Sequence, residues 1–513
     1  MDSAEKNSAF DKRLKRQVIG KPHRFLAVVP LGFEKTFVRE MDFLRRESVE
    51  NQGTSSLDIK IAGDGKVEFT AKLVDAWKVV AYSRIANRIL MHIADFKAEN
   101  FRELEKKAAE VPWELYLDES STDVHVTCKH SRLYHSDAVA ERLQKVIEGG
   151  SLPLAAAPAG SSATPSAGAP RNAPKSEASD LAPHTSSLYV TLIDDRCTLW
   201  LDLAGEELYK RGHERFVNDA PLKETIAAGM LYETIRMVSF SLTSKGEARP
   251  HTSKPDTSGD LITLIDPMAG SGTFSLEAAY MANGLIPGKC RDFALKHQPA
   301  FKPATWNHIV NSANANPNPS LRRNNDSELS LQRNDNSMLS LRRNEVTAAI
   351  SSTIHKIITS DISEKAVGII THNVECCPLA NIAPSTAAPT ISPQLRDFFS
   401  YTAKEIADLC GESAPVIVLN PPYGKRLDFD APKLYTQIGK KFTELARELA
   451  PLGKQLTVAI LAPKDDSRPG SKYTCTANLL HECPALDPQQ NSDAKCIATS
   501  HGGLSLNAII ARI

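Results

Sequence analysis

The sequence predicts an α/β protein in which the C-terminal two-thirds of the chain forms a doubly wound parallel sheet. From about residue 260, apolar runs such as "DLITLIDPM", "HKIITSDIS", "APVIVLN" and "QLTVAILAP" alternate with helical stretches. These runs lack the apolar–polar alternation of a strand with one wet face, so helices are expected to cover both faces of the sheet. The last two strands, "AKCIATS" and "GLSLNAIIARI", flank "HGG" with hairpin spacing. They place an antiparallel strand near the end of the domain.

The composition narrows the class of protein. A chain of 513 residues is too long for one typical domain. Lys plus Arg and Asp plus Glu both total 61, so a nucleic-acid partner needs a local basic patch. We find no secretory signal and no apolar run of the roughly 18–20 residues that span a bilayer. The nine cysteines and 14 histidines lack disulfide or metal-ligand spacing, so we expect a cytoplasmic protein with reduced thiols and no metal.

Changes in composition predict the domain boundaries. Polar residues dominate the first segment, and Ala, Pro, Ser and Gly dominate a stretch that cannot bury enough apolar surface to fold. A later stretch repeats every ten residues, as in "SLRRNNDSEL" and "SLQRNDNSML", and is expected to be a low-complexity insertion. The expected segments are a flexible tail (1–20), an α+β subdomain (21–80), a second α+β domain (81–150), a disordered linker (151–187) and the α/β domain (188–513, with the insertion at about 311–346).

Two local predictions depend on these boundaries. The stretch "DAWKVVAYSRIANRILMHIADF" is expected to be helical. The antiparallel pair "SLYVTLIDD" and "CTLWLDLAG" is expected to open the α/β domain, because it directly precedes the helix in "APLKETIAAGMLYETIRMV".

The first candidate site follows the strand in "LIDPMAGSGTFSLEAA". Asp266 and Pro267 close the strand, and Gly270 and Gly272 form a turn into a helix that begins at Thr273. Glycines let a backbone approach a ligand closely, and the helix N-terminus offers free N–H groups. The turn lacks both the Lys of a phosphate-binding P-loop and the third glycine of the dinucleotide fingerprint. In open α/β sheets, ligands bind at this carboxyl edge of the strands.

Two further acids follow later strands, and each has two interpretations. Asp361 in "IITSDISEKAV" fits an acid that binds ribose hydroxyls, but Asp361 or Ser363 also fits a helix N-cap. Asp397 in "QLRDFF" could accept the exocyclic amine of an adenine, with Phe398 packed on the ring, or it could be a turn residue.

The stretch "VIVLNPPYGKRL" contains residues that could activate an amino group as a nucleophile. An amine conjugated to a planar ring is a poor nucleophile because its lone pair is delocalised. The side-chain oxygen of Asn420 and the carbonyl of Pro421 can each accept one N–H, which favours a pyramidal nitrogen. Pro421 and Pro422 fix the backbone, and Tyr423 offers a face on which a base can stack. The simpler alternative is a strand that ends in prolines beside a surface tyrosine.

"DPMAGSGT" followed by "NPPYG" resembles the amino-group methyltransferases of the class I, S-adenosylmethionine-dependent kind. The resemblance implies a Rossmann-like fold with a seven-stranded sheet and one antiparallel strand, and S-adenosyl-L-methionine as cofactor. It implies cofactor contacts from Asp266, Pro267, Gly270, Gly272, Thr273, Asp361 and Asp397, and a catalytic tetrad of Asn420, Pro421, Pro422 and Tyr423. The tetrad is shared by adenine-N6, guanine-N2 and glutamine-N5 methyltransferases.

Flanking segments are similar to one family, the 23S rRNA guanine-N2 methyltransferases that carry a THUMP RNA-binding domain, in the form with a single methyltransferase domain. "SRLYHSDAVAERL" resembles the end of a THUMP domain, and "KRGHERFVNDAPLKETIAAGML" resembles a connecting segment of the family. The resemblance implies a ferredoxin-like subdomain at 21–80, THUMP at 81–150, and RNA contacts from Lys129, Arg132, His135 and Arg211. The simpler alternative for the charged loop around Lys129 and Arg132 is ordinary solvated charge.

The chain departs from the family pattern at two places near the expected site. "RGYR" in the family is "RGHER" here, with His213 and Glu214, and the usual Glu after "NPPYG" is Lys425. We therefore carry three hypotheses. The first is a monomeric enzyme that methylates the 2-amino group of a guanine in rRNA. The others are an adenine-N6 methyltransferase and an RNA-binding ribosome-assembly factor that has lost catalysis.

Overall fold

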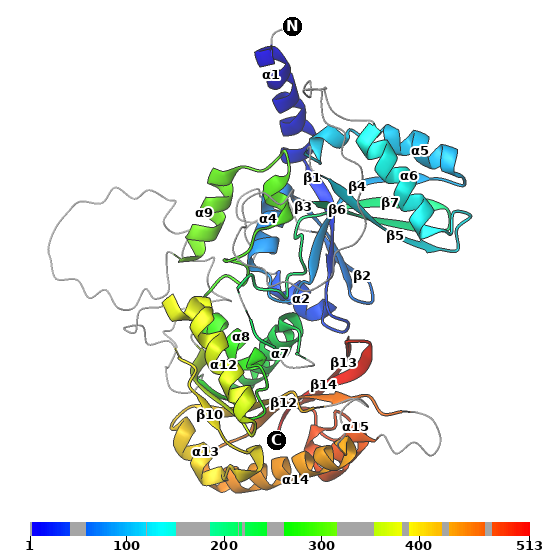
Figure 1. Ribbon diagram of the computed structural model, residues 1–513. Coiled ribbons are helices and arrows are strands. Elements are labelled where there is room, and N and C mark those ends of the chain that lie inside the picture. Colours follow the sequence, from blue (N-terminus) through cyan, green and yellow to red (C-terminus); the bar gives the residue numbers. More distant parts are fainter. Residues whose placement is uncertain are drawn as a thin grey trace, which may run out of the picture. The chain divides into compact units, whose positions relative to one another are not determined.

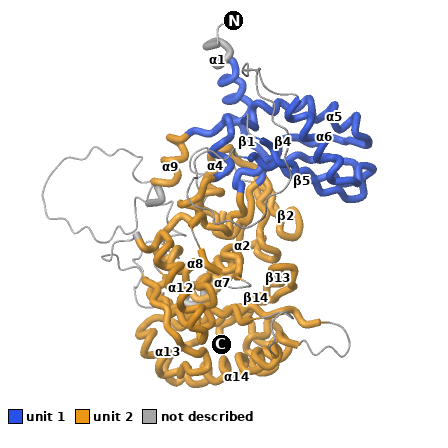
Figure 2. The backbone as a smooth tube through the Cα atoms, viewed as in Figure 1, with its two compact units in different colours: residues 1–24, 90–205, 293–302 blue, residues 25–89, 206–292, 303–513 orange. Residues whose placement is uncertain are grey.

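The computed structural model describes most of the chain and divides it into two compact units (Figures 1 and 2). Unit 1 comprises residues 1–24, 90–205 and 293–302, and unit 2 comprises residues 25–89, 206–292 and 303–513. The structure describes residues 3–41, 58–118, 121–149, 185–213, 215–217, 221–243, 261–314, 353–381, 389–422, 430–466 and 474–513. Nearly all of the expected linker and insertion, with Glu214, Tyr423 and Lys425, therefore lies outside the described residues.

Unit 1 is built on four neighbouring strands in the order β4-β7-β6-β5. β5 and β6 run parallel, and the β6–β7 and β7–β4 pairs are antiparallel. The strands are β4 (Arg88–Lys97), β5 (Thr122–Lys129), β6 (Ser186–Ile193) and β7 (Arg196–Asp202), and the helices are α1 (Ser3–Leu14), the π-helix η1 (Lys15–Ile19), α5 (Phe101–Ala109), η2 (Trp113–Leu115), α6 (Ser136–Gly149) and η3 (Ala294–His297).

Three expectations about this region are wrong. Residues 3–19 are helical rather than a flexible tail, because Leu14 and Val18, one helical turn apart, are both buried. The helix expected through residue 96 ends at Tyr82, and residues 88–97 form β4, whose backbone pairs with β7 from Leu90 to Lys97. The strands β6 and β7 pair with β5 and β4 instead of opening the α/β domain, so the domain boundary at residue 188 is wrong.

Unit 2 begins with a small α+β segment that packs on the rest of the same unit. Its strands lie in the order β2-β3-β1, and the rings of Phe25 and Phe69 stack with centroids 5.2 Å apart. Glu233 of α7 accepts hydrogen bonds from Thr36 and Lys495, each at 2.7 Å. The elements are β1 (Pro22–Val28), α2 (Glu34–Glu40), β2 (Ile59–Gly63), β3 (Lys66–Lys72) and α4 (Leu73–Tyr82). Residues 25–89 therefore form one unit with the α/β sheet and are not a separate N-terminal subdomain.

The remainder of unit 2 is a seven-stranded sheet in the order β10-β9-β8-β11-β12-β14-β13. The pairs from β10 to β12 are parallel, and β14 is antiparallel to both β12 and β13. The strands are β8 (Ile262–Asp266), β9 (Ile354–Asp361), β10 (Pro393–Leu395), β11 (Ala414–Leu419), β12 (Thr457–Pro463), β13 (Ala494–His501) and β14 (Leu504–Arg512). The predicted doubly wound sheet with one antiparallel strand near the end is confirmed.

Helices cover both faces of this sheet, with α7, α8 and α12 on one face and α13, α14 and α15 on the other (Figure 1). The four residues Val416–Leu419 of β11 are at most 1% exposed, as expected for a strand buried on both sides. The helices are α7 (Glu224–Thr243), α8 (Thr273–Ala282), α9 (Pro303–Asn314), α12 (Glu364–Cys376), α13 (Ala403–Cys410), α14 (Ala431–Leu449) and α15 (Cys475–Glu482), with short 3₁₀ turns η5 (Pro378–Asn381), η6 (Phe398–Ser400), η7 (Ala450–Leu452) and η8 (Pro484–Leu486).

Candidate active site

The glycine-rich turn between β8 and α8 is shaped to leave space at the carboxyl edge of the sheet. Gly270 has φ +58° and Gly272 has φ +78°, a backbone region that side chains disfavour. A Cβ on Gly272 would lie 3.1 Å from the side chain of Ile370, so this glycine permits close packing of α12. A Cβ on Gly270 would meet nothing within 4 Å, so the turn is open where a ligand would approach.

Asp361 holds this turn from the neighbouring strand. Its Oδ2 accepts the N–H of Gly270 at 2.9 Å, and its Oδ1 accepts the N–H of Ser363 at 2.9 Å. The N-cap of α12 is Ser363, whose Oγ accepts the N–H of Ala366. The capping alternative therefore belongs to Ser363, and the half-buried carboxylate of Asp361 stays a candidate for ribose binding.

Asp266 is almost fully buried at the end of β8, together with Pro267. Its Oδ2 accepts both the backbone N–H and the hydroxyl of Ser275, at 3.2 and 2.8 Å, so it caps the first turn of α8. Among the described residues, its Oδ1 has no hydrogen-bond partner. Burial raises the pKa of Asp266 to about 7.

We expect this buried carboxyl to make stability depend on pH. Because the ordinary pKa is 3.8, the folded state between that value and about 7 holds a proton that the unfolded state has lost. The stabilisation from Asp266 is therefore complete at low pH and is lost as pH rises through about 7, by up to roughly 4 kcal/mol. Urea unfolding of wild type and Asp266→Asn at about pH 5 and about pH 8 measures it. An equal pH dependence in the two proteins would contradict the prediction.

At 397–398 the structure favours the turn interpretation over the predicted adenine contact. Asp397 is the N-cap of η6, where its Oδ1 accepts the N–H of Phe399 at 3.0 Å, as the turn alternative predicted. Phe398 is 1% exposed and packs in the core beside Phe442, so the expectation that its ring packs on a ligand is wrong. Ile362 is instead 72% exposed directly after Asp361. An apolar residue directly after a strand-end acid is a sequence signal that could have identified Ile362 as a candidate adenine contact.

Asn420 follows β11, which pairs in parallel with β8, so Asn420 and the glycine-rich turn lie at the same edge of neighbouring strands. The Asn420 Oδ1 is buried and, among the described residues, accepts no hydrogen bond. Pro421 is buried and Pro422 is exposed. A buried acceptor without a partner is costly in a folded protein, which points to an N–H donor that binds there.

A second set of residues fastens the glycine-rich turn, and the sequence did not reveal it. Arg215 donates to Ser271 Oγ at 3.1 Å and to Thr273 Oγ1 at 2.5 Å, and it pairs with Glu224. The Nδ2 of Asn373 donates to the carbonyl oxygens of Ser271 and Phe216, at 3.1 and 2.9 Å. Asn373 Oδ1 accepts the N–H of Phe216 at 2.7 Å. The segment 215–217 is thereby bound to the turn, although it is distant in sequence.

Two residues of "RGHER", His213 and Arg215, have hydrogen-bond partners near the glycine-rich turn and its helix α8. His213 Nε2 lies 2.9 Å from the hydroxyl of Tyr280 and its ring makes an edge contact with that tyrosine. Burial lowers the pKa of Arg215 to about 10, so it stays a cation at neutral pH. The hydroxyl of Thr273, expected to contact the cofactor, is occupied by Arg215.

The RNA contact predicted for Arg211 is wrong. Arg211 is 5% exposed, and its donors are used inside unit 2 by Glu277 and by the carbonyl oxygens of Leu208 and Arg84. Three of the five N–H donors of this guanidinium are bound inside the unit, and its burial keeps it from the surface where a phosphate would bind, so Arg211 is structural.

The other three predicted RNA contacts lie on the surface of unit 1. Lys129 and His135 are exposed. Arg132 is 66% exposed but pairs with Glu99, and its Nε lies 3.7 Å from Asp195. The loop is therefore accessible, with acids next to its arginine.

The order and direction of the strands in this part of unit 2, with candidate site residues after β8, β9 and β11, are those of a class I methyltransferase domain. Residues 258–459 match the family described as RMKL-like, methyltransferase domain. Over these residues the chain is similar to the methyltransferase domain of this RMKL-like family.

Several known proteins resemble the chain over most of its length. The "Ribosomal RNA large subunit methyltransferase K/L" of Psychromonas ingrahamii is 24% identical over 393 residues, which are 74% of this chain and 40% of that protein. The protein of the same description from Shewanella sp. strain MR-7 is 25% identical over 82% of this chain and 46% of its own length. The chain thus spans less than half the length of these relatives.

Solved structures agree on the fold. The crystal structure of a possible methylase from Clostridium difficile 630 has a TM-score of 0.59 and 19% identity, covering 96% of this chain and 98% of that one.

Within the described residues, no helix is long and apolar enough to cross a membrane. Nor does that part of the chain gather three or more His, Cys, Asp or Glu side chains that could hold a metal ion.

Proposed function

We propose that the chain is an S-adenosylmethionine-dependent methyltransferase that modifies the 2-amino group of a guanine in large-subunit rRNA. The observation that carries this proposal is the buried, unpartnered Oδ1 of Asn420, at the same sheet edge as the glycine-rich turn. The description shared by the curated relatives supports rRNA as the substrate.

The candidate cofactor residues are consistent with binding of an adenosyl group. S-adenosylmethionine supplies an electrophilic methyl group on sulfur. The open face of Gly270 leaves room for the backbone to approach the cofactor, and the carboxylate of Asp361 can accept ribose hydroxyls while it holds the turn. The exposed side chain of Ile362 offers an apolar contact for the adenine. The carboxylate oxygen of Asp397 other than Oδ1 can accept an N–H of the adenine amine.

The acceptors at the end of β11 activate the target amine. Asn420 Oδ1 and the Pro421 carbonyl each accept one N–H, which turns the nitrogen lone pair toward the methyl group. Tyr423 is proposed to stack on the base, which must leave its helix to reach the pocket. After transfer, the nitrogen carries a positive charge and is acidic enough to release its proton to water, so we assign no general base.

Unit 1 is proposed to bind structured RNA as a THUMP domain, whose predicted bounds of 81–150 change to residues 90–149 together with the strands β6 and β7. The exposed Lys129 and His135, with Arg132 beside them, are the proposed phosphate contacts. We further expect a monomer that works in the cytoplasm.

Mass spectrometry of rRNA nucleosides from cells with and without the protein tests the proposal. We expect one N2-methylguanosine to disappear from large-subunit rRNA when the protein is absent. Loss of an N6-methyladenosine instead would make the enzyme an adenine methyltransferase. Unchanged nucleosides, together with no S-adenosylmethionine binding by calorimetry, would favour the assembly factor.

A further inference from the structure

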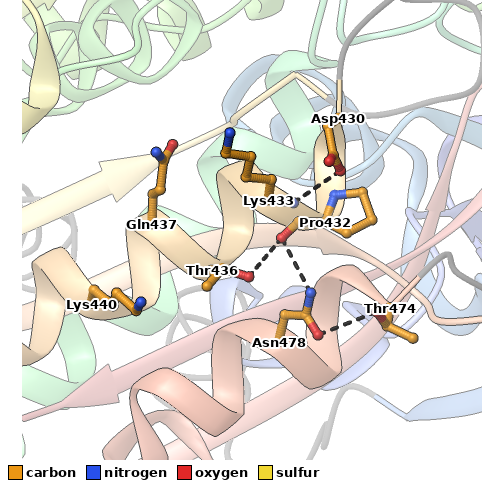
Figure 3. Close-up of a pocket in the computed structure, with 8 residues that line it drawn as sticks. All are labelled: Asp430, Pro432, Lys433, Thr436, Gln437, Lys440, Thr474 and Asn478. Carbon is orange, nitrogen blue, oxygen red and sulfur yellow. Dashed lines mark hydrogen bonds between the residues drawn. The ribbon is translucent and has the colours of Figure 1, made fainter.

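A polar groove lies between the first turns of α14 and α15, outside the residues assigned to the cofactor or to the target amine (Figure 3). It is open to solvent, has a volume of about 680 Å³, and is lined by Asp430, Pro432, Lys433, Thr436, Gln437, Lys440, Thr474 and Asn478. No aromatic ring and no large aliphatic side chain is among these residues. The lining therefore suits a polar ligand better than an apolar small molecule.

The groove lies at the edge of the sheet where methyl transfer is proposed. α14 follows β11 and Asn420, and α15 follows β12, which is the parallel neighbour of β11. The first turns of both helices therefore share the carboxyl edge with Asn420. A nucleic-acid strand with its target base at Asn420 would pass close to this groove.

The floor of the groove is fixed by hydrogen bonds (Figure 3). The carbonyl oxygen of Pro432 accepts the hydroxyl of Thr436 at 2.9 Å and the amide of Asn478 at 3.3 Å. Thr474 donates to Asn478 Oδ1 at 3.2 Å. The single acid, Asp430, caps α14 by accepting the N–H of Lys433 at 3.2 Å. The Asn478–Pro432 bond joins α15 to α14, and the other three bonds fix the first turn of each helix.

Two lysines along the groove have no acidic partner in the part of the chain that the structure describes. Lys433, Gln437 and Lys440 are exposed at positions i, i+4 and i+7, which is one face of α14. Among the described residues, neither lysine has an ion pair, whereas the neighbouring Lys441, with a largely buried side chain, pairs with Glu444 at 2.9 Å. The two positive charges lie about 10 Å apart along the helix axis, so they can reach more than one phosphate.

We propose that this groove binds the sugar–phosphate backbone of the RNA strand that carries the target base. The inference rests on the proposed function and adds a substrate contact within unit 2, outside the THUMP region. Lys433 and Lys440 contact phosphates, and Gln437 donates to phosphate or ribose oxygens. Such contacts set the position of a strand without reading its sequence.

The test compares two double charge reversals in the full-length protein. Lys433→Glu with Lys440→Glu changes the groove. Lys356→Glu with Arg447→Glu changes net charge equally at the opposite edge, at the amino end of β9 and near the end of α14. The assays are methyl transfer to protein-free 23S rRNA, RNA affinity at several salt concentrations, and calorimetry with S-adenosylmethionine.

We expect the groove variant to lose at least about tenfold in kcat/KM for RNA. The magnitude of its slope of log affinity against log salt should decrease by about 1.4, because two phosphate contacts are lost and each contact with a single strand contributes about 0.7. S-adenosylmethionine affinity should match the control in both variants. Equal kcat/KM and equal salt slopes for the groove and control variants would overturn the inference. Failure of the proposed function can be distinguished from failure of the groove inference, because the wild-type protein itself would then transfer no methyl group to the RNA.

Discussion

Asn420→Ala is expected to lower turnover on rRNA by roughly a hundredfold or more and to leave S-adenosylmethionine affinity nearly unchanged. The Oδ1 of Asn420 is buried and has no partner among the described residues, so it is available to an incoming N–H. Removing it takes away an acceptor that is already in place when the amine must lose its planarity. The loss should therefore appear in kcat for RNA, measured with saturating cofactor.

A matched control separates this role from a structural one. Asn491 is also a half-buried amide in unit 2, but its Nδ2 donates to the carbonyl oxygens of Ala485 and Arg512. Asn491→Ala should lose some stability and retain kcat. If cofactor affinity fell together with turnover in Asn420→Ala, Asn420 would be a structural residue and the assignment would be wrong.

The sheet edge could be predicted from sequence because its signals are local. Each strand is a short buried run, and each ends in residues that favour a turn, as at Asp266, Asp361 and Asn420. Such runs must form strands covered on both faces, and parallel strands bring their ends to one edge. The same reasoning could not find Arg215 or Asn373, because their contacts with the glycine-rich turn join segments more than 50 residues apart.

The predicted domain boundary at residue 188 was wrong for a related reason. Nothing in "SLYVTLIDD" or "CTLWLDLAG" indicates which sheet accepts the strand. The first segment pairs with β5 and the second with β4, each across a long stretch of chain. The composition predicts a linker at 151–187, and the predicted change of fold coincides with that linker, whereas the pairing of β6 and β7 places the change after residue 202. A truncation at residue 150 would therefore leave β6 and β7 without their neighbouring strands, and loss of activity would not isolate RNA binding.

Residues 25–89 also belong with the methyltransferase sheet because buried charges join them. Glu277 of α8 has a fully buried side chain and accepts a hydrogen bond from Arg211 Nε at 2.8 Å. Arg84, which follows α4, lies with its Nη1 3.5 Å from the other oxygen of Glu277. Glu277 thus contacts two buried guanidinium groups from separate parts of the chain, and the buried Glu40 lies near enough to interact electrostatically with both.

Glu277→Ala is therefore expected to destabilise unit 2 by about 3–5 kcal/mol, because it removes the carboxylate that contacts both buried arginines. Glu206→Ala is the matched control: Glu206 pairs with Lys210 at 2.9 Å in the same unit, but its side chain is 67% exposed, so the change should cost less than about 1 kcal/mol. Urea unfolding followed by circular dichroism measures both variants. Equal unfolding midpoints would show that the buried cluster contributes no more than a surface pair. A large loss for Glu277→Ala alone would show that Arg84 and Arg211 belong to the structural core of the methyltransferase unit and not to its RNA-binding surface.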